Sequence, residues 1–143
     1  VMMDYLDSLG EGPSFYPEDP YEKAKVQEII RYLELYIELP ARRLYGDVFF
    51  GKPASDELKA EVKPQLEKGF AALAKIAKYE PYIAGSQISY ADFYFRFSFN
   101  LATLVCKRAL DWNAQGEFEG AKNLMKLMDE RASVQKVLAD QKG

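Results

Sequence analysis

The chain has 143 residues, of which 48% are hydrophobic and 29% charged, and its net charge is −3. This length and balance fit one globular domain with a sizeable core and exclude a disordered chain. No apolar run approaches the roughly 20 residues that a membrane-spanning helix needs. No basic stripe indicates nucleic-acid binding. We therefore expect neither a membrane nor a nucleic acid as a partner.

The chain contains no histidine and a single cysteine, Cys106. The missing histidine removes the commonest general base, the usual partner of a Ser or Cys nucleophile and the commonest zinc ligand. We therefore assign no catalytic residue and no metal site. A lone cysteine forms no internal disulfide, and no signal-peptide pattern opens the chain, which together fit a reducing, cytoplasmic setting. Cys106 lies in an apolar stretch and is interpreted as a core residue.

Two features precede the first long helix. Residues 1–9 have the pattern of the tail of a helix, and residues 10–19 hold prolines and glycines typical of a linker or an ordered turn. A helix fragment in this place indicates an amino-terminal truncation. Asp19 and Pro20 then predict a helix start, because Asp is a good N-cap and Pro suits the first helical position.

Apolar residues at helical spacing predict a first long helix over residues 20–45 and a second over residues 56–78. Ser55 is the predicted N-cap of the second helix. Proline interrupts both patterns. We predict a kink without an end at Pro40, and a bend or short break at Pro64.

The strongest local signal is the start of a third helix over about residues 90–108. Ser89 and Asp92 have the spacing of a capping box, and Ile88 and Phe93 that of a hydrophobic staple. We give these four residues a structural role and not a catalytic one, because no base stands between the hydroxyl and the carboxylate. The helix is apolar nearly all round, which predicts a buried central helix.

Two shorter helices are predicted near the end of the chain, over residues 118–128 and 133–138. No strand pattern and no internal repeat appears. We therefore predict an all-α domain in which about five helices form a bundle around the buried central helix.

Three stretches carry motifs in a fixed order along the chain. They are Asp4-Tyr5-Leu6 with Phe15-Tyr16-Pro17-Glu18-Asp19-Pro20, then Ile88-Ser89-Tyr90-Ala91-Asp92-Phe93, and finally Met128-Asp129-Glu130-Arg131-Ala132-Ser133-Val134. Together they resemble the carboxy-terminal helical domain of cytosolic glutathione transferases, and residues 38–44 resemble bacterial or fungal members of that family. Ala132 departs from the family, which often has proline there, and this costs some rigidity at the helix start.

The resemblance implies a division of the chain and a set of partners. Residues 1–9 would be a remnant of the last helix of a missing thioredoxin-like domain, residues 10–19 the linker, and residues 20–143 the carboxy-terminal domain. In relatives the missing domain binds the cosubstrate glutathione and carries the Tyr, Ser or Cys that stabilises its thiolate. Glutathione conjugation of a small hydrophobic electrophile, a detoxification reaction, is therefore expected only with that domain. Relatives form homodimers, here through the faces of residues 21–45 and 56–78.

The resemblance also points to the first long helix and the central helix as walls of the hydrophobic site. Tyr36, Pro40 and Arg43 are three or four residues apart and share a helix face. Tyr36 can press its ring on an apolar substrate, and Arg43 can hold a carboxylate or sulfonate. Phe97 of the central helix is a further wall candidate. The alternative is that Tyr36 packs against the missing domain, that Phe97 is a core residue and that Arg43 pairs with a surface acid.

Two other functions stay open at this stage. The same helical fold serves as a non-catalytic protein-interaction module, and it also occurs in glutathione-dependent dehalogenases, isomerases and reductases. The nature of the domain before the linker would separate these possibilities. The linker match at residues 4–20 favours the transferase.

Overall fold

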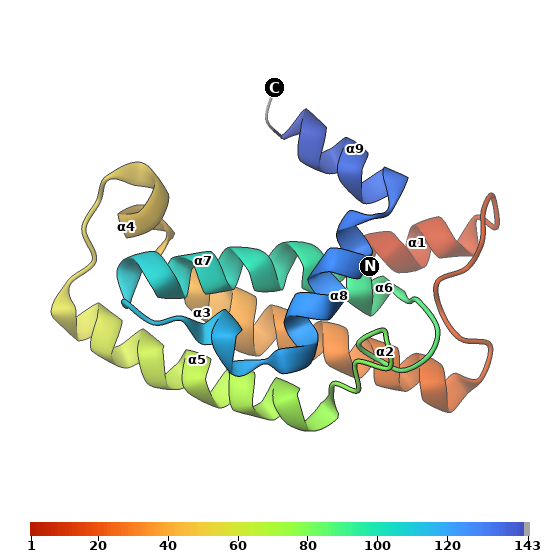
Figure 1. Ribbon diagram of the computed structural model, residues 1–143, viewed down its shortest axis with the longest axis horizontal. Helices are drawn as coiled ribbons and strands as arrows, with labels where there is room; N and C mark the ends of the chain where they lie inside the picture. The colour runs from red at the N-terminus through yellow and green to blue at the C-terminus, as the bar shows by residue number, and fades with distance from the viewer. Residues whose placement is uncertain (142–143) are drawn as a thin grey trace.

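A computed structural model describes residues 1–141 of the chain (Figure 1). Its regular elements in this range are helices, and an isolated bridge joins Tyr82 and Gly85. In chain order the elements are α1 (Met2–Ser8), α2 (Pro20–Tyr32), the π-helical η1 (Leu33–Glu38), α3 (Leu39–Arg42), α4 (Tyr45–Phe50), α5 (Asp56–Ile76), α6 (Tyr90–Tyr94), the π-helical η2 (Phe95–Phe99), α7 (Asn100–Ala109), the 3₁₀-helical η3 (Ala114–Glu117), α8 (Glu119–Asp129) and α9 (Ala132–Asp140). The all-α prediction is confirmed.

The five helices expected from the sequence are all present. α2, η1 and α3 form the first long helix, α5 is the second, and α6, η2 and α7 together form the central helix, followed by α8 and α9. The sequence pattern missed the short α4, whose first turn has no capping side chain. It ends at Gly51, whose φ of 60° is the left-handed conformation that glycine adopts at little cost.

Two predicted N-caps have the expected geometry. The Asp19 carboxylate accepts a hydrogen bond from the Glu22 N–H at 2.9 Å, and the Ser55 hydroxyl accepts one from the Leu58 N–H at 3.2 Å. Each cap satisfies a backbone donor that has no partner within its helix, a contribution of about 1 kcal/mol. These local bonds fix where the two outer long helices begin.

The first long helix passes through Pro40 without ending, and the turns before it have the wider π-helical form. Proline has no N–H, so Pro40 cannot donate to the Tyr36 carbonyl four residues earlier. That carbonyl faces Gly69 of α5, where an added Cβ would lie 2.1 Å from the Tyr36 oxygen. The missing side chain of Gly69 therefore allows the close approach of α5 beside Pro40.

The second long helix shows no break at Pro64, because α5 is one helix from Asp56 to Ile76; a bend there stays a prediction. Proline leaves the carbonyl four residues earlier, at Ala60, without its helical partner. Both Pro64 and Ala60 are exposed. Water can therefore solvate that carbonyl, and the helix can continue.

The core lies between the central helix and its neighbours. Phe95 and Phe99 of η2 stack at 4.4 Å between ring centroids, and Phe99 meets Phe70 of α5 at 5.5 Å. Phe118 closes the same cluster, and Cys106 is fully buried, as expected for a core residue. The opposite face of the central helix is only half-buried at Tyr94, Phe97, Ser98 and Leu101. Burial of the central helix is thus complete on one side only.

The first long helix, α5 and the central helix form the body of the bundle, with shorter elements at its ends (Figure 1). The first long helix contacts both α5 and the central helix, and α8 packs across the start of the central helix. α4 and α1 lie at opposite ends of the bundle. Within residues 1–141, no helix combines the length and hydropathy that crossing a bilayer requires.

Candidate functional site

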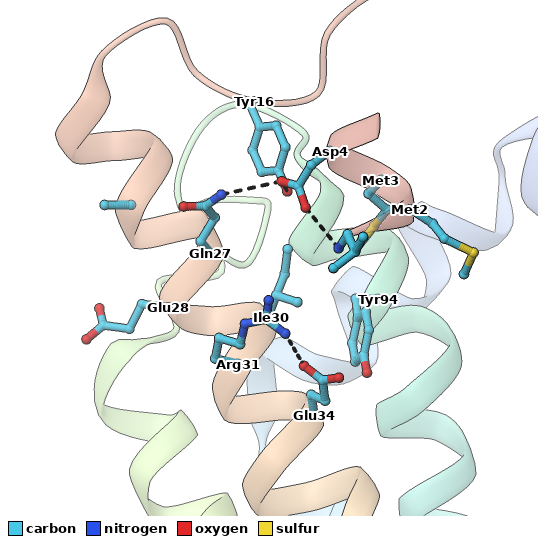
Figure 2. A pocket seen from close by; sticks show the side chains of 12 residues that line it. Met2, Met3, Asp4, Tyr16, Gln27, Glu28, Ile30, Arg31, Glu34 and Tyr94 are labelled. Atoms are coloured by element: carbon cyan, nitrogen blue, oxygen red, sulfur yellow. Dashed lines mark hydrogen bonds and ion pairs between the residues drawn. The ribbon is translucent and has the colours of Figure 1, made fainter. Parts of the chain in front are cut away.

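A cleft of about 630 Å³ opens between α1, α2 and the start of the central helix (Figure 2). Its apolar lining comes from all three helices and includes Met2, Met3, Ala24, Ile30 and the ring of Tyr94. The polar groups among them are Asp4, Tyr16, Gln27, Glu28, Arg31 and Glu34. A mostly apolar hollow with a few placed polar groups is typical of a binding site for a small molecule.

Polar contacts hold α1 as one wall of this cleft. The Tyr16 hydroxyl donates to Asp4 at 2.9 Å, and the Tyr90 hydroxyl donates to Asp7 at 3.0 Å. Burial, together with the bond to Asp4, raises the pKa of Tyr16 to about 12. None of the α1 side chains is fully buried. These two tyrosine–aspartate hydrogen bonds are therefore the main specific contacts that hold α1 against the rest of the bundle.

At the edge of the cleft, the buried carboxylate of Glu38 joins the first long helix to the central helix. One oxygen, Oε2, accepts from the Tyr94 hydroxyl at 2.8 Å and from the Ser98 hydroxyl at 2.7 Å. The other, Oε1, accepts from Arg42, with Nε at 3.0 Å. We call Glu38, Arg42, Tyr94 and Ser98 the Glu38 cluster. It lies where the two π-helical segments contact each other, and such segments are frequent at functional sites.

The Glu38 cluster carries charge at neutral pH. Burial alone would raise the pKa of Glu38, but hydrogen bonds from Ser98, Arg42 and Tyr94 outweigh it, and the pKa lies below its ordinary value. Burial, and next the bond to Glu38, raise the pKa of the Tyr94 phenol. The carboxylate is therefore ionised and the phenol keeps its proton, so Tyr94 is not prepared to act as a base.

A second cleft, of about 680 Å³, lies between the linker and the loop that precedes the central helix. Its walls are mainly the segments 13–17 and 84–89. Side chains on helices are held more precisely than side chains on loops. We therefore take the cleft framed by α1, α2 and α6 as the candidate site.

The structure places Tyr36, Pro40 and Arg43 outside this cleft. Arg43 forms a two-pronged ion pair with Glu61 of α5, in which Nη1 and Nη2 each lie 2.8 Å from a carboxylate oxygen. Pro40 is buried, and the Tyr36 backbone faces α5. The Arg43 side chain and the Tyr36 backbone thus contact α5, while the Tyr36 side chain is 52% exposed. Their role in substrate binding stays a prediction, and the cleft geometry does not support it.

Phe97 also lies apart from the residues that line the cleft. It is half-buried and packs against the core, and the guanidinium of Arg96 lies 5.8 Å from its ring centroid. Arg96 in turn pairs with Asp129 of α8 at 2.5 Å. A part in the wall of a substrate site therefore stays a prediction for Phe97.

The start of the central helix is a hydrogen-bonded capping box. The Ser89 N–H donates to Asp92 Oδ2 at 2.7 Å, and the Ser89 hydroxyl donates to the same oxygen at 3.0 Å. The Ile83 N–H donates to the other carboxylate oxygen at 2.8 Å, which ties the preceding loop to the helix. Burial raises the pKa of Asp92 against the effect of these bonds. Ile88 and Phe93 both pack against the core.

Sequence reasoning missed Glu38, Tyr94 and Ser98 as a group. The four-residue spacing of Tyr94 and Ser98 signals a shared helix face, and this was the one usable clue. Glu38 lies 56 residues from Tyr94 along the chain. An acid within a charged helix is usually solvated, and no local pattern shows that this one is buried.

Comparison with known proteins adds the decisive observation. Residues 12–133 match the family profile described as "Glutathione S-transferase, C-terminal domain". The chain belongs to the glutathione S-transferase family. A glutathione S-transferase of Pseudomonas putida is 39% identical to it over 140 residues, which are 98% of this chain and 64% of that relative. Glutathione S-transferase U17 of Arabidopsis thaliana is 33% identical over 98 residues, covering 64% of this chain and 40% of the plant protein.

A solved structure agrees with the fold of this glutathione S-transferase family member. The glutathione transferase homolog from sulfitobacter, with bound glutathione, superposes with a TM-score of 0.70 at 20% identity, covering 96% of this chain and 72% of that one. The chain thus spans 64% of the length of the Pseudomonas relative and 40% of the Arabidopsis relative. Part of each relative has no counterpart in these 143 residues.

Proposed function

We propose that this chain forms the electrophile-binding part of a glutathione S-transferase, and that conjugation requires an amino-terminal thioredoxin-like domain. In this proposal, residues 1–9 are the last helix of that domain, residues 10–19 are the linker and residues 20–143 are the carboxy-terminal domain. The greater length of the Pseudomonas relative supports this division. So does α1, a separate short helix that polar contacts hold against the bundle.

The observation that carries the proposal is the cleft with apolar walls beside α1. In conjugation, the glutathione thiolate attacks an electrophilic carbon, a sulfur–carbon bond forms and the leaving group departs. An apolar wall that fixes the electrophile next to the thiolate raises the effective concentration of the two reactants. The cleft supplies such a wall, and the absent domain would supply the glutathione site. Nucleophilic attack of this kind needs no metal ion.

We also propose a homodimer that uses the faces of residues 21–45 and 56–78. Large apolar side chains on the first long helix support it, because Tyr21, Leu35 and Leu39 are exposed. Exposed apolar groups along one helix are typical of an interaction surface. A cytoplasmic, detoxifying enzyme fits the lone cysteine and the reducing setting in which glutathione is kept.

The test is conjugation by the full-length protein. With glutathione and a nitro-substituted aryl chloride, we expect turnover above the uncatalysed rate. Ala24→Trp, which narrows the cleft, should raise KM for the aryl chloride about tenfold and leave KM for glutathione unchanged. Ala74→Trp, at an exposed site on α5, is the matched control. Unchanged kinetics in Ala24→Trp would place the electrophile elsewhere, and glutathione binding without any conjugation would favour an interaction module.

A further inference from the structure

Tyr94 connects the cleft to the Glu38 cluster. Its ring lines the cleft together with Ile30 and Glu34 of the first long helix (Figure 2). Its hydroxyl donates to Glu38 Oε2 at 2.8 Å. A phenol has one proton to donate and two lone pairs that accept. Because the proton is committed to Glu38, the Tyr94 oxygen can only accept a hydrogen bond from another molecule.

The other groups around the Glu38 carboxylate hold it in place as the acceptor of the Tyr94 proton. Ser98 and Tyr94 both donate hydrogen bonds to Oε2, and Arg42 donates to Oε1. The residue is 9% exposed, so water competes poorly for these bonds. Hydrogen bonds to an ionised acceptor are about twice as strong as neutral ones. The direction of the Tyr94 hydroxyl is therefore set by three groups on two helices, Glu38, Arg42 and Ser98.

The charges near Tyr94 come in pairs of opposite sign. Glu34 lies one turn before Glu38 on the first long helix, lines the cleft and pairs with Arg31. A ligand atom beside the Tyr94 oxygen thus has carboxylates on the neighbouring turns of that helix. Each of these carboxylates is neutralised by an arginine, Glu34 by Arg31 and Glu38 by Arg42, so the selection of a ligand group depends on the Tyr94 oxygen and not on net charge.

We infer that Glu38 fixes Tyr94 as a hydrogen-bond acceptor at the cleft, so that the cleft selects apolar ligands carrying a hydrogen-bond donor, such as phenols or aryl amides, over ligands of similar shape without one. Tyr94 is then the specificity-determining residue, and Glu38 is a positioning residue that acts through it. This rests on the proposed function, because it takes the cleft as the place where the electrophile binds.

The experiment compares 2-naphthol, which has a donor, with 2-methoxynaphthalene, which has none. The dissociation constant of each is measured for the full-length protein, and shifts of the Ile30 methyl signals in NMR spectra locate the ligand in the cleft. The wild-type protein should prefer 2-naphthol. In Tyr94→Phe, which keeps the ring and removes only the oxygen, this preference should fall about fivefold to tenfold, the effect of one hydrogen bond.

Glu38→Gln separates positioning from simple stability. The substitution gives Tyr94 a neutral hydrogen-bond partner and lets the phenol donate to a ligand. The affinity for 2-methoxynaphthalene should therefore rise, and the affinity for 2-naphthol should fall. A merely structural role of Glu38 would weaken both ligands alike. Tyr21→Phe, which changes an exposed tyrosine on α2, is the control and should keep the wild-type preference.

Two results would overturn the inference, and they can be told apart. If both ligands shift the Ile30 signals and Tyr94→Phe keeps the wild-type preference, Tyr94 does not select the ligand, and the proposed function stands. If neither ligand shifts the Ile30 signals, the cleft is not the binding site, and the proposed function fails together with the inference.

Discussion

At the scale of single residues, Glu38 shows how distant partners decide the state of a buried charge. Its carboxylate accepts from side chains on its own helix and on the central helix. Asp19 and Ser55, in contrast, act only on N–H groups three residues away. The two caps could therefore be predicted from the sequence, since near neighbours determine them. Glu38 could not be, because only Arg42 lies near it in the sequence, and the fold brings Tyr94 and Ser98 to it.

The lowered pKa of Glu38 predicts how its stabilising effect depends on pH. The native carboxylate binds its proton less tightly than the unfolded chain does, so the stabilisation is present at neutral pH. It is lost as the pH falls below the ordinary value of 4.5 and through the native pKa. Glu38→Gln should lower the free energy of unfolding by about 2 kcal/mol at pH 7, and this difference should shrink toward pH 4.

Urea unfolding at the two pH values measures this difference. Glu67→Gln, which changes an exposed acid on α5, is the matched control and should unfold like the wild-type protein at both. A loss in Glu38→Gln that is the same at pH 7 and pH 4 would show that the charge of Glu38 is not what stabilises the cluster.

At the scale of helices, hydrophobic periodicity located the long elements but not their internal form. The pattern predicted the bounds of the first long helix and the central helix to within a few residues, because apolar spacing follows the helical repeat. It gave no sign of the π-helical turns η1 and η2. It also indicated that Tyr36, Pro40 and Arg43 share a face, yet not that Arg43 and the Tyr36 backbone contact α5. Which neighbour a helix face meets is a property of the tertiary packing.

The close approach of α5 to η1 makes Gly69 a sensitive position. In Gly69→Ala the new methyl group would meet the Tyr36 carbonyl at 2.1 Å, so the backbone must shift. We expect a loss of about 2 kcal/mol or more in unfolding free energy, as in overpacked cores. Gly46→Ala in α4, where an added Cβ meets ordinary contacts at 3.6 Å, should stay within about 1 kcal/mol of the wild-type protein.

Thermal or urea unfolding of both variants checks this prediction. Equal stability of Gly69→Ala and Gly46→Ala would mean that α5 and η1 are less closely packed than the structure indicates. The comparison is direct because both positions lie in helices, where alanine is otherwise favoured over glycine.

At the scale of the whole molecule, the all-α bundle and the family could be predicted from the sequence, and the location of the cleft could not. The caps, the apolar stripes and the ordered motifs are local features that can be identified from the sequence alone. The cleft exists because Asp4 and Asp7 hold α1 against Tyr16 and Tyr90, and because Glu38 ties two helices together beside it. These pairings join residues between 12 and 83 positions apart.

The most direct test of this account is a crystal structure of the full-length protein with a bound conjugate of glutathione and an aromatic electrophile. We predict that the aromatic group lies in the cleft, against Ile30 and the ring of Tyr94, with α1 as the opposite wall. An aromatic group bound against Tyr36 and Arg43, on the α5 side of the first long helix, would contradict this placement of the site.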